Sequence, residues 1–148
     1  MVRGNTLVVV AILFMFARLQ VLAAEKPSIA SCEGASTERV VRFDEDAKRV
    51  FVQAQLKQIG TPNRARSALK RLQALVDKCR PSWGKAWSVS FFSEPKYAGY
   101  KDEPQLRSYV MDGRWSRAYV GEYDQAAKKL TLNPADPKRV RSFAVELP

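Results

Sequence analysis

The chain of 148 residues contains no histidine. Ser-His-Asp and Cys-His catalysis both need an imidazole as the base, so these mechanisms are excluded. Common catalytic zinc sites also use histidine, and two cysteines are too few to replace it, so no transition-metal site is expected. The glycines are isolated and lack the spacing of a phosphate-binding loop. We therefore expect neither a metal nor a cofactor.

Cysteine is scarce, since Cys32 and Cys79 are the only two in the chain. A reactive thiol pair usually has the spacing C-x-x-C, which is absent. In an exported chain, two cysteines usually form one disulfide bond, and this one would constrain the unfolded chain by about 4 kcal/mol. The sequence thus predicts a structural Cys32–Cys79 disulfide.

Long apolar runs are absent except at the N-terminus, where residues 7–17 are all apolar. As a helix this run would span roughly 16 Å, which is too short for a hydrocarbon core of about 30 Å. Arg3 precedes the run, and residues 21–23 follow it with the side chains that a signal peptidase recognises. This pattern predicts a signal peptide.

The predicted signal peptide covers residues 1–24, with cleavage after Ala23 or Ala24. It places the protein in the periplasm or outside the cell, with no membrane span after cleavage. The alternative is an uncleaved N-terminal membrane anchor, which would have to include Arg18 at a cost of about 2.5–3.5 kcal/mol if central. Residues 25–148 are then expected to form a single α+β domain with an irregular leader over residues 25–36.

Acidic residues are outnumbered, with 15 Asp and Glu against 25 Lys and Arg and a formal net charge of +10. This excess favours anionic partners and says nothing about the fold. The basic residues are spread along the chain, and those between Arg64 and Arg71 are most simply the solvated side of a helix. An anionic envelope polymer or a nucleic acid remains a possible partner.

Two helices are expected in the first half of the domain. Asp44 is a candidate N-cap for a helix that ends at Gly60, with Glu45 and Asp46 in its first turn. Thr61 is a candidate N-cap for a second helix over Pro62–Cys79, where apolar residues recur with the helical period.

Strands are expected in the second half. Residues 86–93 alternate between two faces, and Asp112-Gly113 is a turn signal ahead of a strand over residues 114–124. Leu130 and Leu132 indicate a partner strand, and residues 139–147 a last one. The predicted fold is two N-terminal helices packed on one face of a three- to five-stranded antiparallel sheet.

Aromatic residues are concentrated between Trp83 and Tyr123. Strand alternation would place Trp115, Tyr119 and Tyr123 on one face together with Arg117, a mixture typical of binding surfaces. A long loop beside this face carries two further tyrosines and a lysine. The candidate binding residues are Tyr97, Tyr100, Lys101, Trp115, Arg117, Tyr119 and Tyr123. The alternatives are that the rings pack under the helices while Arg117 extends to an edge, and that the loop is a packed connector.

Carboxylates are the remaining candidates for acid–base catalysis. A glycoside hydrolase needs two carboxyl groups about 5–9.5 Å apart, which Glu122 could form with Asp102 or Glu103 if the loop folds over the strand. The simpler interpretation is that these residues end turns and pair with basic residues.

We therefore expect a small exported binding or inhibitor-like domain without catalysis, whose partner is a protein or an envelope component. The alternatives are a polyanion-binding protein and a carboxylate-based hydrolase of cell-wall glycan.

The predicted disulfide can be tested by thiol titration of the unfolded, unreduced protein. We expect no free sulfhydryl group before reduction and two after it, because both cysteines would be joined in one bond. Two free sulfhydryl groups in the unreduced protein would contradict the bridge.

Overall fold

The structure is a computed structural model that describes residues 38–148. The predicted signal peptide, the leader and Cys32 lie outside the described residues, so the predictions made for them stay predictions. Cys79 is buried at the end of a helix, where it is 3% exposed. Among residues 38–148, no helix is both long and apolar enough to cross a membrane.

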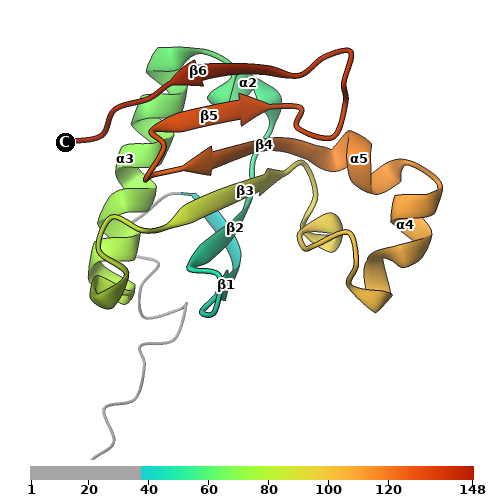
Figure 1. Ribbon diagram of the computed structural model, residues 1–148, viewed down its shortest axis with the longest axis horizontal. Coiled ribbons are helices and arrows are strands. Elements are labelled where there is room, and N and C mark those ends of the chain that lie inside the picture. The colour runs from blue at the N-terminus through green and yellow to red at the C-terminus, as the bar shows by residue number, and fades with distance from the viewer. Residues whose placement is uncertain (1–37) are drawn as a thin grey trace, which may run out of the picture.

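One six-stranded mixed sheet organises the described chain, and its strands lie side by side in chain order (Figure 1). The strands are β1 (Arg39–Asp44), β2 (Arg49–Gln53), β3 (Ser88–Phe92), β4 (Tyr119–Asp124), β5 (Lys129–Leu132) and β6 (Arg141–Ala144). The pair β2–β3 is parallel, and the other four pairs are antiparallel. The parallel pair needs a long crossover, which contains α2 (Leu56–Ile59) and α3 (Pro62–Cys79).

The helix predicted between Asp44 and Gly60 is wrong, because most of this segment forms the β1–β2 hairpin and only its end is helical. Asp44 Oδ1 accepts hydrogen bonds from the backbone N–H groups of Asp46 and Ala47, at 3.1 and 3.2 Å. These bonds resemble those of an N-cap, but here they close a turn. Val50, Phe51 and Val52 then point alternately to two buried faces, an environment that suits β-branched and aromatic side chains in a strand.

The predicted second helix is confirmed as α3. Thr61 Oγ1 accepts from the N–H of Arg64, and Pro62 occupies the first turn, as the sequence indicated. The apolar side of α3 packs on one face of the sheet, and together they form the main core. Its buried helix residues are Ala65, Ala68, Leu69, Leu72, Leu75, Val76 and Cys79.

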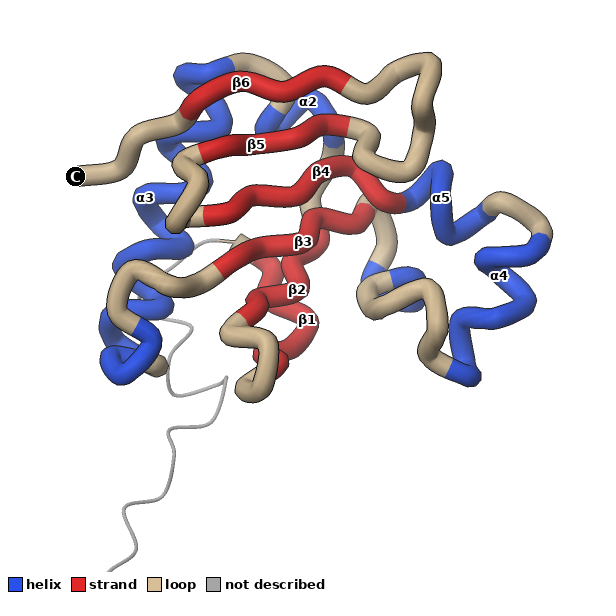
Figure 2. The backbone as a smooth tube through the Cα atoms, viewed as in Figure 1, coloured by secondary structure: helices blue, strands red, loops and turns tan. Residues whose placement is uncertain are grey.

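The opposite face of the sheet is covered over only part of its width, by residues 94–118, which we call the covering segment. It contains 3₁₀ turns at Pro95–Tyr97 and Pro104–Leu106, followed by α4 (Arg107–Met111) and α5 (Arg114–Ala118). Figure 2 shows these short helices grouped at one end of the sheet, away from α3. They bury a second apolar cluster that includes Phe51, Phe92 and Trp115.

The predicted architecture is therefore wrong in two respects. The sheet is mixed and has six strands, and four helices lie among residues 38–148 rather than two N-terminal ones. Residues 114–118 are helical instead of extended, because Gly113 takes a left-handed backbone angle (φ 78°) that starts α5. This helix turns Trp115 and Ala118 into the second cluster.

The contribution of the second cluster to stability can be tested at Phe92. This residue is 0% exposed, and its ring stacks on that of Tyr119 with 4.7 Å between the ring centroids. We expect Phe92→Ala to lower the free energy of unfolding by about 3–5 kcal/mol, because it leaves a cavity between the sheet and the covering segment. Urea unfolding measures this change. Met111→Ala, at an 83% exposed position, is the control. A loss for Phe92→Ala no larger than for the control would show that the covering segment does not depend on this packing.

Candidate functional site

Beyond the covering segment, the same face of the sheet carries polar side chains. Strand register places Ser90 opposite Glu122, Glu122 opposite Thr131, and Thr131 opposite Ser142, in one row across β3 to β6. The Oγ1 of Thr131 and the Oγ of Ser142 are 2.9 Å apart, so these side chains point to the same side. Together with their charged neighbours they form what we call the polar strip. It consists of Arg49, Ser90, Glu122, Asp124, Lys129, Thr131 and Ser142.

Hydrogen bonds join the polar strip to the edge of the covering segment. Arg49 donates from Nη1 to Ser90 Oγ at 2.9 Å, and the same nitrogen lies 3.7 Å from Glu122 Oε2. The Tyr119 hydroxyl donates to Glu122 and also lies 3.4 Å from Ser90 Oγ. The guanidinium and the carboxylate are thus already paired, and their geometry is fixed by neutral hydroxyl groups.

A pocket of about 340 Å³ opens where the covering segment ends over the polar strip. We call it the Glu122 pocket. It is lined by Arg49, Phe51, Ser90, Gly99, Tyr100, Lys101, Asp102, Trp115, Tyr119 and Glu122. A second hollow of about 160 Å³ shares Glu122 and continues over β4 and β5, where Asp124, Ala127, Lys129 and Thr131 line it.

The loop above the Glu122 pocket is attached to the rest of the structure at three points. The Tyr100 hydroxyl donates to Asp44 Oδ2 at 2.6 Å, and Glu103 forms an ion pair with Arg42. The Trp115 indole N–H donates to the carbonyl of Gly99 at 3.1 Å. These contacts hold the loop over the strands and fix the shape of the pocket.

Both tyrosine hydroxyls at the pocket are hydrogen-bond donors near neutral pH. Burial, followed by the hydrogen bond to Asp44, raises the pKa of Tyr100 to about 12. Burial also raises the pKa of Tyr119, and its hydrogen bond to Glu122 raises it further. In return, the Tyr100 hydroxyl lowers the pKa of Asp44 below its usual value.

The structure brings together four of the predicted binding residues, since Tyr100, Lys101, Trp115 and Tyr119 all line the Glu122 pocket. Tyr97 and Arg117 instead line a separate hollow of about 160 Å³ on the covering segment.

Tyr123 is 0% exposed in the core beneath α3, so the expected common face of Trp115, Arg117, Tyr119 and Tyr123 is wrong. Residues 114–118 are helical, and a bulge in β4 shifts the pairing between β3 and β4 next to Phe92. The bulge interrupts the alternation that would place Tyr119 and Tyr123 on one side of the sheet.

Several residues of the polar strip escaped the sequence analysis. Arg49 fell within the wrongly predicted first helix, and Thr131 and Ser142 are ordinary strand residues. The alternation of residues 86–93 placed Ser88 and Ser90 on one face, together with Phe92. Only the pairing of distant strands reveals that these hydroxyl groups share a row with Glu122.

The loop does fold over the strand, as a pair of catalytic carboxylates would require. Asp102 and Glu122 line the same pocket, whereas Glu103 turns to Arg42 on β1. Asp102 is exposed, and Glu122 is engaged by Tyr119 and Arg49. Within residues 38–148, no group of three or more Asp, Glu or Cys side chains is placed to hold a metal ion.

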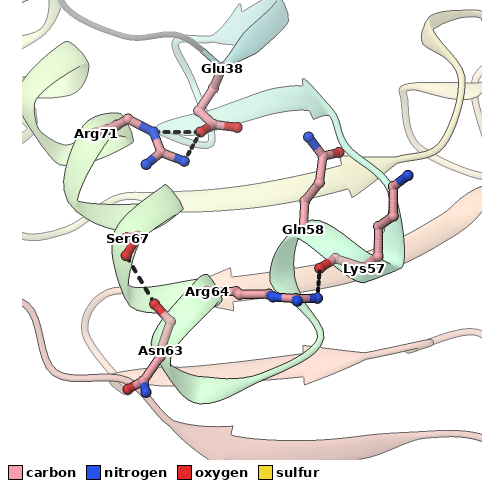
Figure 3. A pocket seen from close by; sticks show the side chains of 7 residues that line it. All are labelled: Glu38, Lys57, Gln58, Asn63, Arg64, Ser67 and Arg71. Carbon is pink, nitrogen blue, oxygen red and sulfur yellow. Dashed lines mark hydrogen bonds and ion pairs between the residues drawn. The ribbon is translucent and has the colours of Figure 1, made fainter.

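A larger, shallow hollow of about 550 Å³ lies elsewhere, between α2, α3 and the start of β1 (Figure 3). Its basic side chains are Lys57, Arg64 and Arg71. Arg64 Nη1 donates to the carbonyl of Lys57 at 2.8 Å, and Arg71 Nε donates to Glu38 Oε1 at 2.7 Å. Two of the three cations are thus used within the protein, which weakens this hollow as an anion site.

No protein-family model, no curated protein and no solved structure matches the chain.

The attachment of the loop can be tested with Tyr100→Phe. We expect this variant to lose about 1.5–3 kcal/mol of unfolding free energy at pH 7, because the hydroxyl bonds a charged carboxylate. A carboxyl group whose folded pKa is lowered stabilises the folded state above its unfolded pKa, and this stabilisation disappears as the pH falls through the folded pKa. The difference between wild type and Tyr100→Phe should therefore stay constant from pH 7 down to the ordinary pKa of an Asp side chain, about 4, and shrink as the pH falls further.

Urea unfolding at several pH values measures this difference. Tyr109→Phe is the control, since its ring packs on Tyr97 away from Asp44. A Tyr100→Phe deficit that is the same at every pH would contradict the hydrogen bond to an ionised Asp44.

Proposed function

We propose that the chain is a small exported binding domain without catalysis, and that its ligand occupies the Glu122 pocket. The observation that carries this proposal is the prearranged group of Arg49, Glu122 and Tyr119 beneath a loop attached at three points. Ligand sites commonly combine apolar walls with a few fixed polar groups, and the rings of Tyr100 and Trp115 are part of the lining here. Export rests on the N-terminal sequence alone.

The surroundings of the carboxylates support the part of the proposal that excludes catalysis. The chain has no histidine, and the carboxylates that line the Glu122 pocket are Asp102 and Glu122. A glycosidase acid is usually held protonated by an apolar environment, and Asp102 is exposed to solvent instead. Glu122 is held by a hydroxyl donor and a guanidinium, which fits a group that orients a ligand.

A carboxylate-based hydrolase of cell-wall glycan is the second candidate, because Asp102 and Glu122 line one pocket. A single measurement distinguishes this candidate function from the binding function. Release of reducing ends from cell-wall glycan by the wild type, with loss of that release in Glu122→Gln, would replace the binding proposal with this one.

The binding proposal can be tested by capture of envelope components with the processed protein at low and high ionic strength. Arg49→Gln and Glu122→Gln should each weaken retention of the captured component about tenfold, because each removes one side of the fixed pair. Retention should differ little between the two salt concentrations. Arg64→Gln, at the hollow of Figure 3, and Glu146→Gln, at an exposed ion pair, are matched controls.

Two results would overturn the proposal. Equal retention by the pocket variants and the wild type would show that the Glu122 pocket is not used. A steep loss of retention with salt, accompanied by sensitivity to Arg64→Gln, would instead indicate a polyanion-binding protein. Thermal unfolding of every variant establishes that it remains folded.

A further inference from the structure

The Glu122 pocket is one end of a longer trough. Glu122 lines both the pocket and the hollow over β4 and β5, so the two depressions adjoin each other. From there the row of polar side chains continues to Thr131 on β5 and Ser142 on β6. Neighbouring strands are about 4.8 Å apart, and Ser90 is only 1% exposed, so the accessible row from Glu122 to Ser142 extends about 10 Å. This is longer than a single sugar ring or amino acid.

The outer part of this trough is open to solvent. Asp124, Lys129 and Ser142 are exposed, and Glu122 and Thr131 are partly exposed. In Figure 1, α3 crosses behind the strands, and none of the helices between residues 38 and 148 lies in front of β4, β5 and β6. The inner end at the covering segment is more enclosed, since Trp115 and Tyr119 are 8% and 9% exposed. A ligand could thus be anchored at one end and extend across the strands at the other.

The charges along the trough are balanced. Arg49 and Lys129 are matched by Glu122 and Asp124, and Arg49 already faces Glu122 at 3.7 Å. A charged ligand would have to compete with these internal partners. A neutral ligand with many hydroxyl groups can instead accept from a guanidinium and donate to a carboxylate in the same site, leaving the existing pair in place. Charge balance therefore favours a neutral polyhydroxylated ligand over a polyanion.

The position of the trough also argues against an extended peptide. Such peptides usually add to a free sheet edge, where unpaired backbone groups are available. The trough crosses β3, β4 and β5, which are each paired on both sides. Only side chains are offered here, and most of them are hydroxyl or carboxylate groups. Sugar hydroxyls match these groups, and the partly exposed ring of Tyr100 in the lining of the Glu122 pocket offers a surface for the C–H face of a sugar ring.

We infer that the ligand is a neutral oligosaccharide that lies across the strands, with one sugar in the Glu122 pocket and the following sugars over Thr131 and Ser142. This inference rests on the proposed function of the Glu122 pocket as a binding site. To that proposal it adds the chemical class of the ligand and the direction in which the ligand crosses the strands. Affinity should rise with the number of sugar units until the row is covered, and then stay constant.

The test uses the processed protein and two neutral series, β-linked glucose and β-linked N-acetylglucosamine oligomers of one to six units, with titration calorimetry. We expect at least one series to bind, with affinity that rises about tenfold or more from one unit to the longest ligands and changes little with salt. Thr131→Ala should weaken the long ligands about tenfold and leave the single sugar unaffected, because only the long ligands reach β5. Glu122→Gln should weaken all of them.

Ser67→Ala is the matched control for the loss of a hydroxyl group, since Ser67 Oγ bonds only its own helix at Asn63. The absence of binding by both series overturns the inference, and so does binding that is independent of length and of Thr131. If no sugar binds while an envelope component is still captured through Arg49 and Glu122, the inference fails and the proposed function remains. If neither occurs, both fail.

Discussion

Strands β2 and β3 are buried on both faces, and this constraint shapes the rest of the molecule. Val50, Val52 and Phe91 belong to the core beneath α3, while Phe51 and Phe92 point the opposite way and are just as fully buried. A single helical layer cannot cover both sides, so the chain supplies a second cover from residues 94–118. Because this cover is short, it ends over β4, and the Glu122 pocket lies at its edge.

The helix α3 and most strands could be predicted from local pattern, whereas residues 44–59 could not. The period of α3 is regular because only one of its sides is buried. In β2, burial on both sides removes the alternation that marks a half-buried strand, and the remaining apolar residues fit a helix as well. The Asp44 turn used the same side-chain bonds as a helix start, so the capping signal could not separate the two.

The sequence predicted several residues of the candidate site, but not how they are arranged. The concentration of aromatic residues led to Tyr100, Trp115 and Tyr119, which do meet in one pocket. The grouping with Tyr123 failed because a bulge and a five-residue helix are non-periodic features that local alternation cannot reveal. Arg49 and Thr131 could not have been found, since their partnership with Glu122 depends on pairing between distant strands.

The side-by-side order of the strands follows their order in the chain. As the polypeptide emerges from a ribosome or from a translocation channel, each new strand therefore meets a neighbour that has already left. Pairing is delayed at one point, because α2 and α3 must emerge before β3 can join β2. Because the strands pair in sequence apart from this one delay, few unpaired strand edges are exposed at any moment. This limits aggregation with other chains during synthesis.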